Sequence, residues 1–322
     1  MSRPRVFVAR HLPATALASL SACDVTIWPH AATPPTRLEL HAAVADADGL
    51  LALITDRVDA TLLAAAPRLR VVANMAVGYD NVDLPALVAR GVVLTNTPDV
   101  LTDATADMAW ALLLAAARRV VEGQRTIAAG GWGAWAPGFL VGQPVAGATL
   151  GVVGAGRIGS AVLRRGRGFG MQLRYHNRAP SPALEAETGA QYRAFDDLLR
   201  ESDFVVALVP LNETTREMFD ARAFGLMKPT SVFVNTARGG VVDEAALAVA
   251  LRAGRPWAAG LDVFAREPIA ADHPLLALPN VVAAPHLGSA TVAARHAMAQ
   301  LAAQNIAAVL AGQPPLTPVR AG

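Results

Sequence analysis

The stretch TLGVVGAGRIG at residues 149–159 decides the fold class of this chain. Its apolar start is typical of a buried strand, and Gly154, Gly156 and Gly159 follow with the spacing G-x-G-x-x-G. An amphipathic helical pattern comes next, and a second strand-like run, MQLRYH, begins after Gly170. This order of strand, glycine turn, helix and strand predicts a dinucleotide-binding βαβ unit.

Each glycine of the turn has a separate predicted role. Gly154 allows a tight turn, Gly156 allows a pyrophosphate to approach the backbone, and Gly159 allows the helix to pack closely on the strand. The amides at the helix N-terminus would then receive the phosphate charge. The alternative is a glycine-rich turn with no ligand. The predicted cofactor-binding turn comprises Gly154, Ala155, Gly156, Arg157, Ile158 and Gly159.

The end of the second strand indicates which dinucleotide is bound. NAD-binding folds normally place Asp or Glu there, whereas this chain continues as His176, Asn177 and Arg178. Arg178 can pair with a 2′-phosphate and Asn177 can hydrogen-bond to it. We therefore predict that NADP(H) is preferred, with NAD(H) left open; the alternative is that Arg178 is merely solvated.

Strand-like and helical patterns alternate along the whole chain. A long helix begins near Thr102 and Asp103, and a last helix at about 289–311 ends before Gly312. Two αβ series separated by one helix predict an α/β protein with two doubly wound domains. The predicted strands are RVFVAR, DVTIW, GLLALI, RVVANM and VVLTN in the first series, and TLGVVG, MQLRYH, FVVALVP, SVFVNTA, AAGLDVF and NVVAAPH in the second.

Composition limits the classes of protein that remain. The chain has 322 residues, more than one hydrophobic core usually serves, with 53% apolar and 17% charged residues. The apolar stretch 108–117 is too short for a membrane span, and the N-terminus lacks the pattern of a secretory signal, so we expect a cytoplasmic protein. A net charge of +2 without a basic run argues against nucleic-acid binding, and one cysteine, Cys23, leaves no cysteine cluster for a metal.

Three charged or titratable groups follow strands of the second series. They are Arg238 in NTARGGVVDE, Glu267 in GLDVFAREP and His286 in PHLGSAT. An open α/β sheet places its ligands at the carboxyl ends of its strands, so we expect these groups to lie near one another. Taken singly, each has an ordinary structural explanation, such as a core histidine or a surface ion pair.

These motifs, together with GAGRIG, resemble those of the D-2-hydroxyacid dehydrogenases, in particular the glyoxylate/hydroxypyruvate reductase branch, in the same order along nearly the whole chain. The resemblance implies a Rossmann-type cofactor domain at 100–289 and a flavodoxin-like substrate domain at 1–99 and 290–322, with an active-site cleft between them. It also implies reduction of a small 2-oxo acid to the D-2-hydroxy acid by hydride transfer.

Residue roles follow from this resemblance. His286 would be the general acid, Glu267 would orient it, and Arg238 would bind the substrate carboxylate and polarise the carbonyl. Further positions carried over are Val77 and Gly78 for the substrate and Asp262, Pro210 and Thr215 for the cofactor. Asp80 and Asp83 are interpreted as turn and cap residues, and no catalytic role is expected for His11, His30, His41, His176, His273 or His296.

The irregular segment GGWGAWAPGFLVGQPVAG contains Trp132 and Trp135. In the family that this chain resembles, the segment forms an arm of a homodimer. The alternative, equally compatible with tryptophan, is that these side chains simply fill the core.

Two other functions stay open from the sequence. The first is an NAD(H)-responsive, corepressor-like binding protein of the same fold. The second keeps the chemistry but oxidises 3-phosphoglycerate or formate. It is disfavoured because the chain ends soon after its last helix and because formate dehydrogenases of this fold have glutamine where Glu267 stands.

Overall fold

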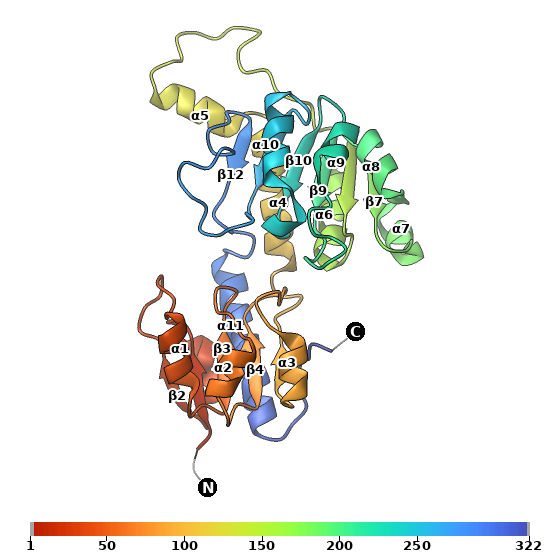
Figure 1. Ribbon diagram of the computed structural model, residues 1–322. Coiled ribbons are helices and arrows are strands. Elements are labelled where there is room, and N and C mark those ends of the chain that lie inside the picture. Colours follow the sequence, from red (N-terminus) through yellow and green to blue (C-terminus); the bar gives the residue numbers. More distant parts are fainter. Residues whose placement is uncertain (1–2, 321–322) are drawn as a thin grey trace. The chain divides into compact units, whose positions relative to one another are not determined.

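The computed structural model describes residues 3–320, so positions 1, 2, 321 and 322 of the predicted first domain lie outside the described residues. The chain divides into two compact units, one made of residues 1–101 and 290–322 and the other of residues 102–289. Each unit contains one parallel sheet with helices on both faces (Figure 1). The predicted α/β class with two doubly wound parts is confirmed.

The first unit has a five-stranded parallel sheet with the order β2-β1-β3-β4-β5. The strand order reverses direction beside β1, which is the flavodoxin-like arrangement. Its strands are β1 (Arg5–Val8), β2 (Asp24–Ile27), β3 (Gly49–Ala52), β4 (Val71–Asn74) and β5 (Val93–Thr95). Its helices are η1 (Ala14–Leu20), α1 (Arg37–Val44), α2 (Ala60–Ala65), α3 (Leu84–Ala89) and α11 (Val292–Leu310).

Polar side chains start several helices of this unit. Thr36 and Glu39 form a reciprocal capping box at α1. Asp83, interpreted from the sequence as a cap, accepts a hydrogen bond from the Ala86 amide at the start of α3. Thr291 caps α11, and Gly312 follows its end with a φ of 75°. The last helix therefore begins and ends within a few residues of the predicted limits, and it packs on β3 and β4.

The second unit has a seven-stranded parallel sheet with the order β12-β11-β10-β9-β6-β7-β8. The reversal of order lies between β6 and β9, which is the Rossmann arrangement with one added strand. Its strands are β6 (Thr149–Val153), β7 (Gln172–His176), β8 (Gln191–Tyr192), β9 (Phe204–Ala207), β10 (Val232–Asn235), β11 (Ala258–Leu261) and β12 (Val281–Ala283). Its helical elements are α4 (Thr102–Ala117), α5 (Val120–Ala128), α6 (Arg157–Gly168), α7 (Pro182–Thr188), α8 (Phe195–Glu201), α9 (Ala221–Leu226), η2 (Gly239–Val241) and α10 (Glu244–Arg252).

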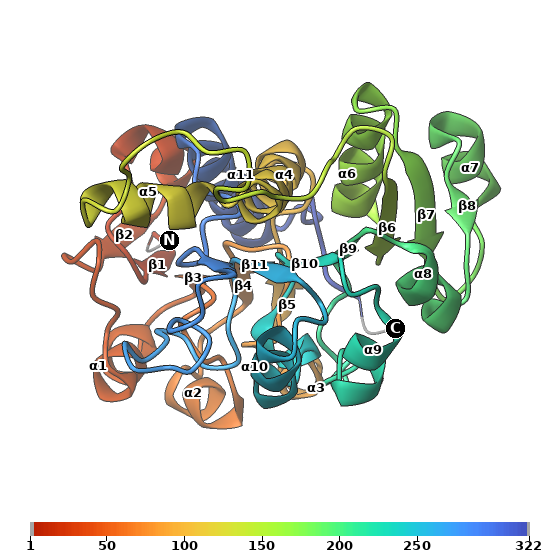
Figure 2. The ribbon, with the colours of Figure 1, turned by 90° about the horizontal axis from the view of Figure 1, so that it is seen from above.

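Alternate strand residues of this sheet belong to two separate cores. Val152 and Val206 pack beneath α4 and α6, whereas Val153 and Val205 pack beneath α8, α9 and α10. Figure 2 shows these two helical layers on opposite sides of the strands. Because both faces are covered, the central strands are apolar throughout, and the polar residues that follow them collect at the carboxyl edge of the sheet.

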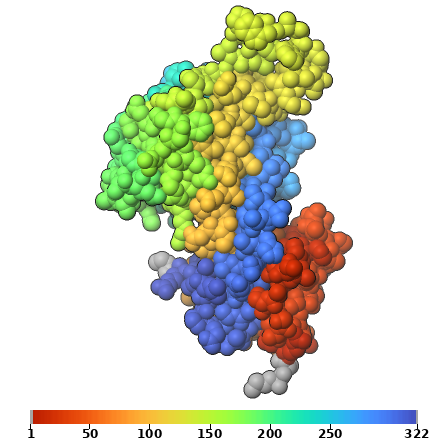
Figure 3. Space-filling view, turned by 180° about the vertical axis from the view of Figure 1, so that it is seen from behind, coloured from red at the N-terminus to blue at the C-terminus, as the bar shows by residue number. Residues whose placement is uncertain are grey.

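Some local features were not predicted. The two-residue strand β8 and the helix α5 were missed, because β8 is too short to show a pattern and α5 buries none of its residues. The segment between α5 and β6 contains no helix or strand, as predicted, and it loops outward from its unit (Figure 3). Within residues 3–320, no helix has the length and hydropathy needed to cross a membrane.

Candidate active site

The carboxyl edge of the second sheet gathers the predicted catalytic residues. Arg238 follows β10, Glu267 lies beyond β11, and His286 follows β12, and these three strands are neighbours in the sheet. Parallel strands end at one edge of the sheet, so Arg238 and His286, which are 48 positions apart in the sequence, are brought to the same edge, as expected.

His286 and Glu267 form a direct pair. The imidazole Nδ1 lies 2.7 Å from Glu267 Oε2, and the side chains are 26% and 34% exposed respectively. A carboxylate on Nδ1 keeps a proton on that nitrogen and leaves Nε2 as the atom available to a ligand. The pair therefore has the arrangement of an oriented proton donor at the carboxyl edge of the second sheet.

The environment of Glu267 keeps its carboxyl group ionised. Burial alone raises its pKa, but the hydrogen bond with His286, the 3.0 Å bond from the Phe264 amide and the positive charges of His286 and Arg238 outweigh burial. The net effect is a lowered pKa for Glu267. Because the charge of Arg238 acts on this carboxylate, the guanidinium belongs to the same electrostatic cluster as the His–Glu pair.

The backbone turn that carries Arg238 is held by a side chain at the end of the preceding strand, β10. The Asn235 side chain donates to the Arg238 carbonyl at 3.0 Å and accepts from the Ala237 amide at 3.0 Å. The guanidinium also donates to the Ala237 carbonyl at 2.8 Å. Asn235 is 1% exposed, so this turn is fixed from inside the sheet.

Asp262 lies beneath the His286 backbone. Its carboxylate accepts hydrogen bonds from the Leu287 amide at 2.6 Å and the Gly288 amide at 2.7 Å. His286 itself has a φ of 55°, in the left-handed region that non-glycine residues rarely occupy. Burial raises the pKa of Asp262, while the two amide bonds and the charge of His286 act in the opposite direction. Asp262 is 1% exposed, so in this structure its carboxylate binds the histidine loop rather than facing solvent.

The glycine turn has the geometry that a pyrophosphate requires. Gly154 has a φ of 97°, and a Cβ there would come within 2.6 Å of the Leu208 carbonyl carbon. Gly156 has open space where its Cβ would be, and as the N-cap of α6 it provides no side chain to the first helical amides. A Cβ on Gly159 would overlap with the Gly154 carbonyl oxygen. The open face at Gly156 and the uncapped amides fit an anionic dinucleotide.

The residues at the end of β7 and directly after it differ in what their side chains contact. Asn177 uses its side chain within the turn, accepting from the Ala155 amide at 2.8 Å and donating to its carbonyl at 3.3 Å. His176 Nδ1 lies 3.0 Å from the Arg193 carbonyl. Arg178 is exposed beside them. Asn177 therefore supports the glycine turn, and Arg178 is the group that faces solvent at this position.

Two further predicted cofactor residues are brought together. The Thr215 hydroxyl donates to the Pro210 carbonyl at 2.6 Å, which closes the loop that follows β9. Because β9 is next to β6, this loop follows the strand beside the glycine turn.

In the first unit, Val77 and Gly78 lie in the loop after β4. Asn96 donates to the Val77 carbonyl at 2.8 Å, and Asn74 donates to the Gly78 carbonyl at 2.9 Å. Among the described residues, neither amide of this dipeptide has a hydrogen-bond acceptor. The loop thus holds its carbonyls inward and leaves two donors for a ligand.

One contact was not predicted from the sequence. His273, for which no catalytic role is expected, has its Nε2 3.3 Å from Glu244 Oε2. The sequence offered one signal, because Glu244 closes the NTARGGVVDE motif, but it gave no reason to connect that motif to a histidine 29 residues later. In the part of the chain from residue 3 to residue 320, no cluster of His, Cys, Asp and Glu could hold a metal ion.

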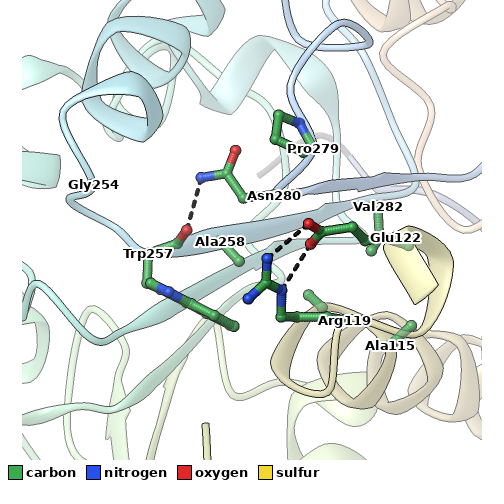
Figure 4. A pocket seen from close by; sticks show the side chains of 10 residues that line it. Ala115, Arg119, Glu122, Gly254, Trp257, Ala258, Pro279, Asn280 and Val282 are labelled. Atoms are coloured by element: carbon green, nitrogen blue, oxygen red, sulfur yellow. Dashed lines mark hydrogen bonds and ion pairs between the residues drawn. The ribbon is translucent and has the colours of Figure 1, made fainter. Parts of the chain in front are cut away.

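A hollow of about 210 Å³ lies at the opposite edge of this sheet (Figure 4). Its walls come from the start of β11 and β12 and from the turn between α4 and α5. Arg119 and Glu122 form a two-pronged ion pair there at 2.7 and 2.8 Å, and Asn280 donates to the Trp257 carbonyl at 2.7 Å. None of the predicted catalytic or cofactor residues lines this hollow.

A Rossmann sheet whose carboxyl edge carries a glycine turn, an oriented histidine and an arginine defines a nicotinamide-dependent dehydrogenase. Comparison with known proteins gives the family. Residues 110–288 match the model described as D-isomer specific 2-hydroxyacid dehydrogenase, NAD binding domain. The chain belongs to this family and is an NAD(P)-dependent dehydrogenase, as the resemblance predicted.

Similar proteins cover nearly the whole chain. A glyoxylate reductase of Thermococcus kodakarensis is 48% identical over 98% of this chain and 96% of its own length. A crystal structure of a Thermus thermophilus protein superposes with a TM-score of 0.92 at 44% identity, covering 98% of this chain and all of that one. The NADPH-dependent glyoxylate/hydroxypyruvate reductase of Sinorhizobium meliloti, solved with NADP and malonate, has a TM-score of 0.84 at 35% identity, covering 99% and 97%.

Proposed function

We propose that this enzyme reduces a small 2-oxo acid, such as glyoxylate or hydroxypyruvate, to the D-2-hydroxy acid, with NADPH preferred over NADH. The observation that carries the proposal is the 2.7 Å pair of His286 and Glu267 at the edge where Arg238 also acts. The names of the relatives from Thermococcus kodakarensis and Sinorhizobium meliloti support the substrate class.

His286 is the proton donor in this proposal. A bound reduced nicotinamide supplies the hydride that the carbonyl carbon accepts. As negative charge develops on the carbonyl oxygen, the proton on His286 Nε2 moves to that oxygen. Glu267 stays ionised because its pKa is lowered, and its contact with Nδ1 holds the His286 ring in one orientation during the transfer.

Arg238 binds the substrate in this proposal. Its planar guanidinium can pair with the substrate carboxylate and at the same time draw electron density from the neighbouring carbonyl. Val77 and Gly78 supply amide donors of the kind that a carboxylate also accepts. These assignments require a ligand with a carboxylate next to a carbonyl, which is the definition of a 2-oxo acid.

The cofactor proposal rests on the turn and its surroundings. Gly154, Ala155, Gly156, Arg157, Ile158 and Gly159 would hold the pyrophosphate, with Pro210 and Thr215 along the groove and Asp262 at the nicotinamide end. Arg178, exposed and without a neighbouring acidic residue in the sequence from His176 to Pro180, would pair with the 2′-phosphate. His176 and Asn177 would support that position from the protein side.

The test is a kinetic panel on the purified protein. Glyoxylate, hydroxypyruvate and pyruvate are each measured with NADPH and NADH. The proposal expects turnover of at least one acid and a higher kcat/KM with NADPH. Arg178→Gln should raise the KM for NADPH while leaving that for NADH unchanged, and Arg200→Gln, at another exposed arginine, serves as the matched control. Cofactor binding without any turnover would favour the corepressor-like alternative.

A cytoplasmic homodimer completes the proposal. Trp132 and Trp135 are 57% and 82% exposed, so they do not fill the core of their unit, and further exposed apolar side chains occur nearby in the sequence. Exposed apolar patches of this kind mark interaction sites. The further exposed apolar residues are Val120, Ile127, Phe139 and Val141. Sedimentation of the wild type and of a Trp132→Ser, Trp135→Ser variant tests this, with dimer expected for the first and monomer for the second.

A further inference from the structure

The segment that carries Glu267 leaves β11 as an irregular loop. Its position must therefore be fixed by contacts outside regular secondary structure. No helix or strand lies between Leu261 and Val281. Glu267 itself supplies one local contact, since its Oε1 accepts from the Phe264 amide. A contact within four residues can shape a turn, but it cannot determine where the turn lies relative to the rest of the sheet edge.

Glu244 supplies a longer-range contact. Its Oε1 accepts from the Ala265 amide at 2.7 Å, across 21 positions of the sequence. The Phe264–Ala265 peptide also lies so closely on Gly239 that a Cβ there would overlap with it. Gly239 is the residue after Arg238. The backbone that carries Arg238 and the backbone that carries Glu267 are therefore in direct contact, and the Glu244 carboxylate joins them.

The other end of the same loop is held by the same carboxylate. Glu244 Oε2 lies 3.3 Å from His273 Nε2, and the Glu244 side chain is 15% exposed. His273 Nδ1 accepts from the Leu275 amide at 3.3 Å, which leaves the proton on Nε2, facing Glu244. Residues 265–273 are thus fixed at both ends by one side chain, with Glu267 between the two attachments.

The backbone of Glu244 is itself fixed in place by the start of α10. It is the first residue of α10, whose N-cap Asp243 accepts from the Ala246 amide at 2.9 Å. A carboxylate in the first helical turn is also favoured by the helix dipole. Bonds from amides to an ionised carboxylate are among the stronger hydrogen bonds in proteins.

We propose that Glu244, assisted by His273, is a positioning residue that holds the Glu267 loop against the Arg238 turn and so aligns Glu267 with His286. The inference rests on the proposed role of the His286–Glu267 pair in proton transfer. It predicts that Glu244 affects the rate of reduction entirely through Glu267, without touching substrate or cofactor.

A double-mutant cycle tests this coupling. Glu244→Ala should lower kcat about 10-fold, with little change in the KM for the 2-oxo acid, because a small misplacement of a catalytic group is costly. Glu244→Gln keeps an oxygen for the Ala265 amide and should retain most of the activity. In a Glu267→Gln background, Glu244→Ala should lower kcat by less than about 2-fold, since the residue it positions is already altered.

The split between kcat and KM separates positioning from a purely structural role. In Glu244→Ala the loss should fall on kcat and be restored in Glu244→Gln, because the Ala265 amide again has an oxygen to bind. A purely structural residue would lower the melting temperature, and its effect on kcat would be the same with Glu or Gln at position 267. Glu187→Ala is the matched control, since it removes an exposed carboxylate and its ion pair with Arg164. If Glu244→Ala does not fold, Glu244→Asp, which shortens the reach by one methylene, takes its place in the cycle.

Each outcome bears on the inference. Wild-type kcat in folded Glu244→Ala, or an equal loss in both backgrounds, would overturn it while leaving the proposed function intact. A wild-type protein without turnover on any 2-oxo acid would instead remove the proposed function, and this inference with it.

Discussion

Two His–Glu pairs occur within the same part of the second unit, and their geometry indicates different roles. His286 and Glu267 are 2.7 Å apart, and the second pair, His273 and Glu244, is 3.3 Å apart. In the first pair the histidine has a strained left-handed backbone, and its second nitrogen is left for a ligand. In the second pair the other histidine nitrogen accepts a backbone amide, so both ring nitrogens are engaged by the protein.

The comparison shows that a carboxylate beside an imidazole does not by itself make a catalytic pair. The catalytic assignment depends on which atoms remain available and on what lies near them. Glu267 experiences the charge of Arg238, whereas Glu244 binds the backbone of the loop. In our proposals, the first pair transfers a proton and the second holds a loop.

Replacing each histidine with glutamine tests most directly whether the two pairs have different roles. His286→Gln should lower kcat about 10²- to 10⁴-fold, the usual contribution of a general acid. His273→Gln, which alters the second pair, should lower kcat only a few-fold, because His273 assists Glu244 and does not reach the substrate in our proposal. Steady-state kinetics at saturating cofactor measures both, and similar losses in the two variants would contradict the assignment.

Arg238→Lys tests the charge that distinguishes the catalytic pair. An ammonium keeps the positive charge but cannot form the planar, two-pronged contact with a carboxylate. We expect kcat/KM to fall by about 10²-fold, as for the loss of one well-placed donor. Arg216→Lys, at an exposed arginine, is the control. Unchanged kinetics in Arg238→Lys would show that a point charge is sufficient there.

Glu267→Gln tests the carboxylate of the first pair. The pKa of Glu267 is lowered in the folded protein, so the carboxylate is ionised at pH 7, and its removal should lower kcat about 10-fold because the His286 ring is no longer held in one orientation. The measurement is kcat at pH 7 and saturating substrate. A kcat within about 2-fold of the wild type would show that the carboxylate does not orient the ring.

The smallest expected effect concerns stability in acid. The pKa of Glu267 is lowered in the folded protein, so its ionised form stabilises the fold above the usual pKa of 4.5, and this contribution is lost as the pH falls through the lowered value. Because the side chain is 34% exposed, the contribution is expected to be about 1 kcal/mol or less. Melting temperatures of wild type and Glu267→Gln should differ at pH 7 and converge near pH 3. A difference that persists at pH 3 would assign it to packing rather than charge.

Much of the architecture could be predicted from periodicity. The central strands are buried on both faces, so they show as continuous apolar runs, and all the strands predicted in the two series are present. Thr102 begins α4, the long helix that was expected there. The short strand β8 and the exposed helix α5 were missed because neither buries enough apolar surface to produce a pattern.

The second His–Glu pair shows where sequence reasoning stops. Nothing in the composition near His273 indicates Glu244, because their contact depends on α10 starting beside the loop that leaves β11. Asn177 gives a similar lesson. Its position suggested a phosphate ligand, but its side chain binds both polar groups of Ala155 in the neighbouring turn.

The sequence by itself determined which backbone conformations and which chemical groups are present. Gly154 permits its positive φ, and the motifs provide one arginine, one carboxylate and one histidine at strand ends. The tertiary structure decided which of these groups meet, through the strand order that brings β10, β11 and β12 side by side. The physical reason is that local conformation depends on neighbours in the chain, whereas the charge, hydrogen-bond partner and exposure of a side chain depend on residues that only packing brings close.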